Sequence, residues 1–357
     1  MVAPCKEEQR RYGQKRACYK YRNLKRFGYS VTKGTNRQGS IAVSYNILVT
    51  GGAGYLGSIL VPALLARDNR VTVLDNFMYR QNSLAQVCDN PNFSVVNGDV
   101  RVNAVIKPLV KSADIIIPLA ALVGAPLCNK DPVTATTTNR DAIINMFSWL
   151  SKEQRLLMPT TNSAYGSGGD VGRHNFCDEN SPLNPISHYA KEKLEVEQAL
   201  MDHENAISFR LATVFGMAPR MRIDLLVNDF TYRAVHDRAV VLFESHFKRN
   251  YIHIRDVANA FLLGLDKVDA MGGEIYNVGL SDANLSKKEL CDRIQQQVAD
   301  FVYVEAEVGR DPDQRNYIVS NEKIESMGFR PRYSLDSGIT ELIKGFSMIK
   351  NTRFGNI

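Results

Sequence analysis

The sequence predicts an α/β fold with a doubly wound parallel sheet and a smaller C-terminal α/β lobe. From Tyr45 onward, short apolar segments alternate with helical segments, the pattern of a parallel sheet covered by helices on both faces. The glycine-rich stretch TGGAGYLGS, at 50–58, lies between the first of these strands and the first helix. After Gly216 the alternation becomes irregular, which indicates a lobe of different construction.

The expected elements follow in order along the chain. Short, buried parallel strands are predicted at 46–50, 71–75, 93–99, 113–121, 155–161 and 206–216. Helices are predicted between them at 56–68, 136–150 and 186–202. Beyond Gly216 we expect helices at 221–237, 287–298 and 335–346, short strands at 240–244 and 249–254, and a loop at 309–317.

Composition excludes several classes of protein. Of the 357 residues, 44% are apolar and 23% are charged, which is ordinary for a globular protein. No window approaches the roughly 18 to 20 apolar residues of a membrane span, so no membrane partner is expected. The six cysteines have neither a CxxC spacing nor a Cys/His cluster, which predicts reduced thiols, a cytoplasmic protein and no metal site.

The positive net charge belongs to the N-terminal tail. Residues 1–40 contain eleven Lys/Arg and two Glu, whereas the remainder holds 33 Lys/Arg against 36 Asp/Glu. A segment so poor in apolar residues is expected to be disordered. Three interpretations are open: an organelle-import presequence, an arm that binds nucleic acid or a membrane surface, or a segment upstream of the true start near Ser44, which we favour.

The glycine-rich stretch predicts a dinucleotide site. It can be read as Gly52-x-Gly54-x-x-Gly57 or, in a wider register, as Gly51-x-x-Gly54-x-x-Gly57. Glycines allow a sharp turn and bring a pyrophosphate close to the N-terminus of a helix. Asp75 ends the second strand, and its carboxylate suits a ribose 2′-hydroxyl but repels a 2′-phosphate. The expected cofactor is therefore NAD.

These observations divide the chain into predicted domains. Residues 1–44 form the basic tail, and 45–217 form a Rossmann-type NAD-binding domain to which 239–277 return. The ranges 218–238 and 278–357 form a substrate-binding lobe. We find neither an internal repeat nor a low-complexity linker.

Tyr189 and Lys193 suggest acid/base chemistry. They are four residues apart on a predicted helix and therefore share one face. A phenol has an ordinary pKa near ~10, and a nearby ammonium lowers it by stabilising the phenolate. Alone, such a pair is weak evidence, but this one follows the strand and loop that contain PTTNSAYG, at 159–166.

An ordered set of motifs resembles the extended short-chain dehydrogenase/reductases that act on nucleotide sugars. The set comprises the wide glycine register, NGDV at 97–100, LAA at 119–121, TNSAYG at 161–166, Tyr189-x-x-x-Lys193 and RNYIHIRDVA at 249–258. The resemblance covers roughly residues 45–350 and makes the wide register the operative one.

The resemblance implies roles for individual residues. Tyr189 would be the acid/base at the sugar C4 hydroxyl, Lys193 would tune it and contact the nicotinamide ribose, and Thr161 would bind the substrate oxygen. The implied cofactor-binding residues are Gly51, Gly54, Tyr55, Leu56, Gly57, Asp75, Asn76, Asp99, Val100, Leu119, Ala120, Ala121 and Lys193. The implied substrate-binding residues are Asn162, Ser163, Arg249 and Arg315. The family also implies a homodimer, formed through the helices at 136–150 and 187–201.

Departures from the family pattern narrow the reaction. Asn162 and Ser163 stand where the dehydratases have an acid pair, which argues against 4,6-dehydration. Pro118 stands where the family often has His. The segments at 118–128, 159–166 and 209–234 resemble, more narrowly, bacterial 4-dehydrogenases of GDP-manno-heptose, which serve surface-polysaccharide synthesis.

Three functions remain open from the sequence. The leading one is NAD-dependent oxidation at C4 of a nucleotide-diphosphate sugar, and the first alternative is a nucleotide-sugar 4-epimerase. The remoter alternative is a non-catalytic relative that binds RNA or protein. Nucleic acid is an unexpected partner because the folded part is slightly acidic, and a body that binds polyanions should be basic.

Overall fold

The computed structural model describes residues 34–35, 41–42, 44–166, 176–306 and 316–349. The chain divides into two compact units, Met1–Val43 and Ser44–Ile357. Within the first unit the described residues form an antiparallel pair, β1 (Gly34–Thr35) with β2 (Ile41–Ala42). The basic tail was predicted to be disordered. Nearly all of its residues lie outside the described ones, so its disorder stays a prediction.

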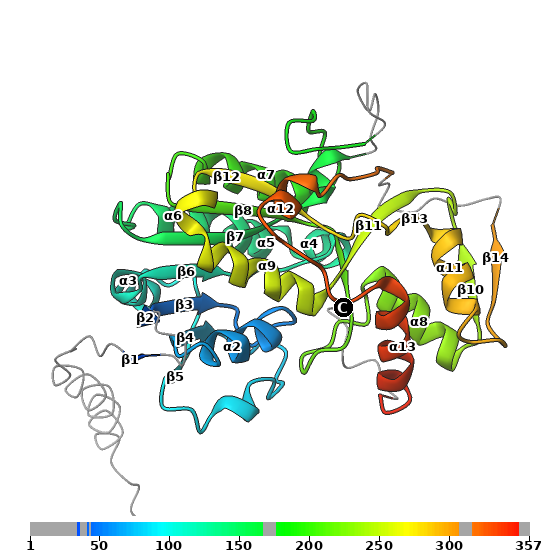
Figure 1. Cartoon of the computed structure of the whole chain (residues 1–357), viewed down its shortest axis with the longest axis horizontal. Helices are drawn as coiled ribbons and strands as arrows, with labels where there is room; N and C mark the ends of the chain where they lie inside the picture. The colour runs from blue at the N-terminus through cyan, green and yellow to red at the C-terminus, as the bar shows by residue number, and fades with distance from the viewer. Residues whose placement is uncertain (1–33, 36–40, 43, 167–175, 307–315, 350–357) are drawn as a thin grey trace, which may run out of the picture. The chain divides into compact units, whose positions relative to one another are not determined.

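A parallel sheet forms the centre of the second unit (Figure 1). Among the described residues, seven strands stand in the order β12-β8-β7-β6-β3-β4-β5, and every neighbouring pair is parallel. The strands are β3 (Asn46–Thr50), β4 (Arg70–Asp75), β5 (Phe93–Asn97), β6 (Ile115–Pro118), β7 (Arg155–Thr161), β8 (Ala206–Leu211) and β12 (Glu274–Val278). The order reverses beside β3, as in a doubly wound sheet. The predicted fold class is confirmed.

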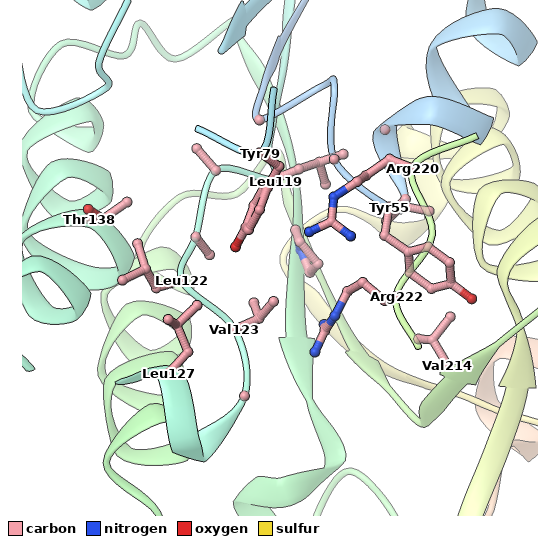
Figure 2. Close-up of a pocket in the computed structure, with 18 of the residues that line it drawn as sticks. Tyr55, Tyr79, Leu119, Leu122, Val123, Leu127, Thr138, Val214, Arg220 and Arg222 are labelled. Atoms are coloured by element: carbon pink, nitrogen blue, oxygen red, sulfur yellow. The ribbon is translucent and has the colours of Figure 1, made fainter. Parts of the chain in front are cut away.

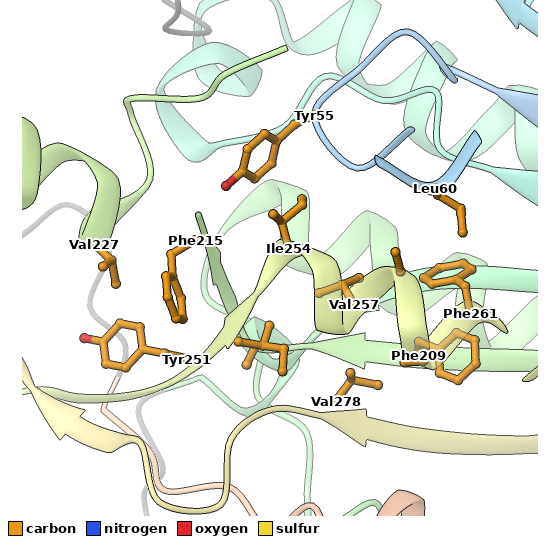
Figure 3. Close-up of a cluster of buried hydrophobic side chains, with 14 of the residues drawn as sticks. Tyr55, Leu60, Phe209, Phe215, Val227, Tyr251, Ile254, Val257, Phe261 and Val278 are labelled. Carbon is orange, nitrogen blue, oxygen red and sulfur yellow. The ribbon is translucent and has the colours of Figure 1, made fainter. Parts of the chain in front are cut away.

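One face of the sheet packs on helices α2 (Gly57–Leu65) and α9 (Ile254–Asp266). Alternate strand residues point to opposite faces of a sheet, and Val49 and Val73 are among those on this one. Gly264 allows α9 to approach the sheet, because a Cβ there would lie 2.8 Å from the ring of Phe209. Figure 3 shows this core, with side chains of α9 next to the strand residues.

The opposite face packs on α3 (Asn103–Ser112), α6 (Ala142–Phe147) and α7 (His188–Leu200). Leu48 and Leu74 point to this face, and each is next in the sequence to a residue, Val49 or Val73, that points to the other. Both faces are therefore apolar, which explains why the strands read as continuous apolar segments in the sequence.

After β8, the described residues form two further small sheets and three further longer helices. One sheet has the order β13 (Asn284–Ser286), β11 (Lys248–His253), β9 (Thr213–Phe215), and the other pairs β10 (Ala239–Leu242) with β14 (Val302–Glu305) in parallel. The helices are α8 (Leu226–His236), α11 (Lys287–Gln295) and α13 (Leu335–Phe346). The shorter elements of the unit are η1 (Ala85–Val87), α4 (Ala125–Lys130), α5 (Pro132–Thr136), η2 (Thr137–Asp141), η3 (Asn162–Tyr165), α10 (Val268–Met271) and α12 (Glu322–Ser326). The proposed domain boundary near Met217 stays a prediction.

Two predicted elements are divided in the structure. The strand expected at 206–216 breaks at Ala212: β8 belongs to the central sheet, and β9 pairs with β11 of the lobe. The peptide N–H of Ala212 still donates to Val278 of the central sheet, at 2.9 Å. The helix expected at 136–150 contains a π-helical turn, η2, that separates α5 from α6.

Two further helices differ from the predictions. The helix expected at 221–237 begins only at Leu226. Residues 221–225 instead belong to the connection between β9 and α8. Helix α9, which follows β11 directly, was not among the predicted elements. In the part of the chain that the structure describes, no helix has the length and apolarity to cross a membrane. The same residues contain no group of three or more His, Cys, Asp or Glu placed to hold a metal ion.

Candidate active site

The glycine-rich loop joins β3 to α2 and lies against the loop after β6. Gly51 has a φ of 66°, and a Cβ there would lie 2.5 Å from the peptide nitrogen of Ala120. A Cβ on Gly57 would lie 2.3 Å from the carbonyl oxygen of Gly52. Both positions need glycine because backbone atoms occupy the space, whereas a Cβ on Gly52 would meet methyl groups of Val73. The backbone thus supports the wide register.

The first turn of α2 presents peptide N–H groups that suit an anion. No side chain caps this helix. Among the described residues, no acceptor pairs with the N–H groups of Tyr55 and Leu56. Unpaired N–H groups and the helix dipole together favour a phosphate at this position. The close-packed glycines and the uncapped helix therefore fit the diphosphate of a dinucleotide.

Asp75, at the end of β4, is held against the glycine-rich loop. Its Oδ2 accepts a hydrogen bond from the N–H of Ala53 at 3.0 Å, and its Oδ1 accepts one from Phe77 at 2.8 Å. Burial raises the pKa of the Asp75 carboxyl above its ordinary value, while the two peptide donors act in the opposite direction. These contacts fix the carboxylate at the rim of the site, where the sequence predicts a ribose contact.

A cavity of about 840 Å³ opens at the carboxyl ends of the central strands, where ligands bind in open α/β sheets (Figure 2). It brings together seventeen of the predicted residues: Gly51, Gly54, Tyr55, Leu56, Gly57, Asp75, Asn76, Asp99, Val100, Leu119, Ala120, Ala121, Thr161, Ser163, Tyr189, Lys193 and Arg249. Asn162 is fully buried and is not among the lining residues. Arg315 lies outside the described residues.

Tyr189 and Lys193 lie one turn apart on α7 and both face the cavity. Ser187 caps this helix by accepting a hydrogen bond from the N–H of Ala190. Burial lowers the pKa of the Lys193 ammonium to about 8, and the charge of Glu192 opposes part of this shift. An ammonium with this pKa still carries its charge near neutral pH, so it can stabilise a phenolate.

Thr161 is the last residue of β7, and its side chain is hydrogen-bonded to Ser163. The Thr161 hydroxyl donates to Ser163 Oγ at 2.9 Å and accepts from the Ser163 N–H at 3.1 Å. Both residues line the cavity that Tyr189 also lines. Because neither Asn162 nor Ser163 is acidic, the loop holds no carboxylic acid at the position of the dehydratase pair.

Asp99 lies in the cavity but already has a cationic partner. Its carboxylate forms an ion pair with Arg101, with an Nη2–Oδ2 distance of 2.6 Å. Hydrogen bonds from Arg101 lower the pKa of the Asp99 carboxyl. Arg101 also lines the cavity and was not predicted as a site residue, so any adenine contact at Asp99 would occur beside this pair.

Three arginines line the cavity in addition to Arg80 and Arg101. Arg249, on β11, was predicted from the sequence, but Arg220 and Arg222 were not. Arg222 forms an ion pair with Asp224. Arg220 is buried, with its guanidinium carbon 4.0 Å from the centre of the Tyr79 ring. The run APRMR, directly after a strand, was the sequence signal that could have identified both residues.

The fold and this site define a dinucleotide-dependent enzyme. The family model described as "NAD dependent epimerase/dehydratase family" matches residues 47–279. The chain belongs to this family, and the predicted NAD dependence is confirmed.

Several known proteins resemble the chain along most of its length. It is 28% identical to the low-salt glycan biosynthesis protein Agl12 of Haloferax volcanii, over 82% of this chain and 96% of that protein. It is 25% identical to UDP-glucuronic acid decarboxylase 1 of Arabidopsis thaliana, over 84% of this chain and 69% of that protein. The structure of a UDP-glucuronic acid 4-epimerase from Bacillus cereus, in complex with UDP-glucuronic acid and NAD, superimposes with a TM-score of 0.74 at 21% identity. That similarity covers 85% of this chain and 99% of the epimerase.

Proposed function

We propose that this enzyme oxidises C4 of a nucleotide-diphosphate sugar. The observation that carries the proposal is that Tyr189, Lys193 and Thr161 line the same cavity as the glycine-rich loop. The acid/base pair and the dinucleotide-binding elements therefore border the same cavity. The related decarboxylase and the 4-epimerase are named for nucleotide-sugar substrates, which supports this substrate class.

The residues around the cavity have separate tasks in this reaction. Tyr189, as a phenolate stabilised by the Lys193 ammonium, accepts the proton of the C4 hydroxyl. When substrate binds, the Thr161 hydroxyl turns its proton from Ser163 Oγ to the C4 oxygen and holds that oxygen near the phenol. Arg222 and Arg249 bind the diphosphate of the substrate, for which guanidinium groups are suited. Bound NAD supplies the acceptor for the hydride that leaves C4.

We further propose that the keto sugar is released, which makes the enzyme a 4-dehydrogenase. Expulsion of the C6 hydroxyl needs an acid, and Asn162 and Ser163 offer none. The resemblance at 118–128, 159–166 and 209–234 favours a GDP-linked heptose. The similarity to a glycan biosynthesis protein supports a role in making polysaccharide sugars.

A 4-epimerase is the second candidate, and the cavity wall favours it. Part of the cavity lining is aliphatic and is formed by Leu122, Val123, Leu127 and Val214 (Figure 2). Such a wall makes no hydrogen bonds to a keto sugar, so the sugar can turn and present its other face to the same cofactor.

Product analysis separates these reactions. The enzyme is incubated with GDP-, UDP-, dTDP- and CDP-sugars, and the products are examined by mass spectrometry and NMR. A 4-dehydrogenase yields a product lighter by a pair of hydrogen atoms, whereas an epimerase yields an isomer of unchanged mass. A product that has lost water or carbon dioxide would contradict both candidates.

A homodimer is also proposed. Two helical regions of the second unit, 132–147 and 188–200, are in contact and correspond to the dimer helices expected from the sequence. The first of these regions carries exposed apolar side chains, Val133 on α5 and Ile144 on α6. Apolar side chains in these positions suit a helix-to-helix interface between two copies.

A further inference from the structure

Arg220 is almost completely buried, at 1% exposure, in the wall of the cavity. Its guanidinium stacks on the ring of Tyr79, which belongs to the connection after β4. One Nη of Arg220 also donates to the carbonyl of Met221. Burial lowers the pKa of Arg220, yet a guanidinium stays charged in proteins, so the positive charge persists inside the wall.

Arg220 and the connection after β4 that carries Tyr79 are each hydrogen-bonded to the dinucleotide-binding elements. The peptide N–H of Arg220 donates to Ser58 Oγ, at 3.4 Å, in the first turn of α2. Ser83 belongs to the same connection as Tyr79, and its Oγ donates to the carbonyl of Ala53 in the glycine-rich loop, at 2.7 Å. The pair therefore lies beside the uncapped N-terminus of α2, as Figure 2 also shows.

Arg222 and Arg249, two further arginines of the cavity, are placed differently. Arg222 is paired with Asp224, and Arg249 is on β11 of the lobe. The peptide N–H of Arg220, through its bond to Ser58, holds the segment after β9 next to α2. The charge of Arg220 and the dipole of α2 act on the same region of the cavity, and both attract an anion.

We propose that Arg220 binds the diphosphate of NAD together with the N-terminus of α2, and that Tyr79 is the positioning residue that holds the guanidinium there. A planar guanidinium can stack on an aromatic ring and still donate from its edge to phosphate oxygens. Arg222 and Arg249 are then left for the diphosphate of the substrate. The inference rests on the NAD dependence of the family and not on the proposed sugar chemistry.

The test measures binding rather than turnover. The full chain, freed of nucleotide, is titrated by calorimetry with NAD, ADP-ribose and adenosine, and separately with GDP and UDP. For Arg220→Gln we expect affinity for NAD and ADP-ribose to fall roughly 10- to 100-fold, the effect of one or two charge-assisted hydrogen bonds. Affinity for adenosine, which lacks phosphate, should not change.

Further variants distinguish binding from folding. Arg220→Lys keeps the charge and should recover part of the lost affinity. Tyr79→Phe keeps the ring and should bind NAD as the wild type does, whereas Tyr79→Leu should weaken NAD severalfold without altering adenosine. If Arg220→Gln does not fold, the Arg220→Lys and Tyr79→Leu measurements decide the question.

Three results would overturn the proposal. An equal loss of affinity for NAD, ADP-ribose and adenosine would show that Arg220 is only structural. Unchanged NAD affinity with weaker GDP or UDP binding would assign Arg220 to the substrate. Unchanged affinity for every ligand would remove it from both sites. None of these results would affect the proposed oxidation at C4, which product analysis tests separately.

Discussion

The phenol of Tyr55 donates a hydrogen bond to the carbonyl oxygen of Gly216, 2.6 Å away. The same hydroxyl accepts a hydrogen bond from the side-chain amide of Asn228 on α8. Tyr55 belongs to the glycine-rich loop, whereas Gly216 begins the segment that carries Arg220 and Arg222. The loop for the cofactor and the segment proposed for both diphosphates are therefore joined by one buried phenol.

Tyr55→Phe is expected to destabilise the fold by about 1–3 kcal/mol, because it leaves the buried Gly216 carbonyl and Asn228 amide each without one partner. The measurement is urea unfolding of the nucleotide-free protein. Tyr232→Phe is the matched control, since the Tyr232 ring packs on Phe346 but its hydroxyl has no described hydrogen bond. Equal stability of the two variants would contradict the role of the Tyr55 hydroxyl.

Lys193→Met is expected to stabilise the nucleotide-free protein near pH 7 while it abolishes turnover. Burial lowers the pKa of Lys193 from 10.5 to about 8. Below pH 8 the folded and unfolded chains both carry this proton, so the folded chain bears the whole cost of a buried ammonium. Between pH 8 and 10.5 the unfolded chain holds more protons, so this group's contribution to stability rises with pH.

The stabilisation by Lys193→Met should therefore be largest below pH 8, at most about 3 kcal/mol, and should vanish toward pH 10.5. Thermal unfolding across this pH range checks it. Lys191→Met, which removes an exposed ammonium from the same helix, should change stability little at any pH. If Lys193→Met stabilised the protein equally at every pH, the buried charge of Lys193 would not be the cause of the stabilisation.

Thr161→Val is expected to lower kcat about 10- to 100-fold, because it removes one hydrogen bond to the C4 oxygen in the transition state. Thr161→Ser retains the hydroxyl and should recover most of the rate. Steady-state kinetics with the identified sugar provide the measurement. A Thr161→Val enzyme with wild-type kcat would exclude this hydroxyl from the reaction.

Light scattering of the wild-type chain at micromolar concentration should give the mass of a dimer. Ile144→Glu places a charge on α6, where Ile144 is 39% exposed, and should shift the mass toward the monomer. Val241→Glu is the control, because Val241 is 58% exposed on β10, away from the dimer helices. A monomeric wild type, or equal effects of both variants, would contradict the proposed interface.

Local patterns sufficed for much of the fold and the site. Strands β3 to β8 were predicted because each is a short apolar run, and the glycine-rich loop was predicted because its glycines are spaced as a fingerprint between a strand and a helix. The break at Ala212 was missed, because an apolar run does not show that a strand changes sheets. The stacking of Arg220 on Tyr79 was missed for a similar reason: it joins residues far apart in the sequence, and no local spacing encodes such a contact.

The most direct test of the account follows the near-ultraviolet absorbance of reduced nicotinamide, with the NAD-loaded enzyme near the concentration of the added sugar. GDP-, UDP-, dTDP- and CDP-sugars are added in turn to the wild type and to Tyr189→Phe. We expect a lasting signal with one sugar in the wild type, and a rate reduced by about 100-fold or more in Tyr189→Phe with NAD binding retained. A Tyr189→Phe enzyme as fast as the wild type, or neither a signal nor an altered sugar with any substrate, would contradict it.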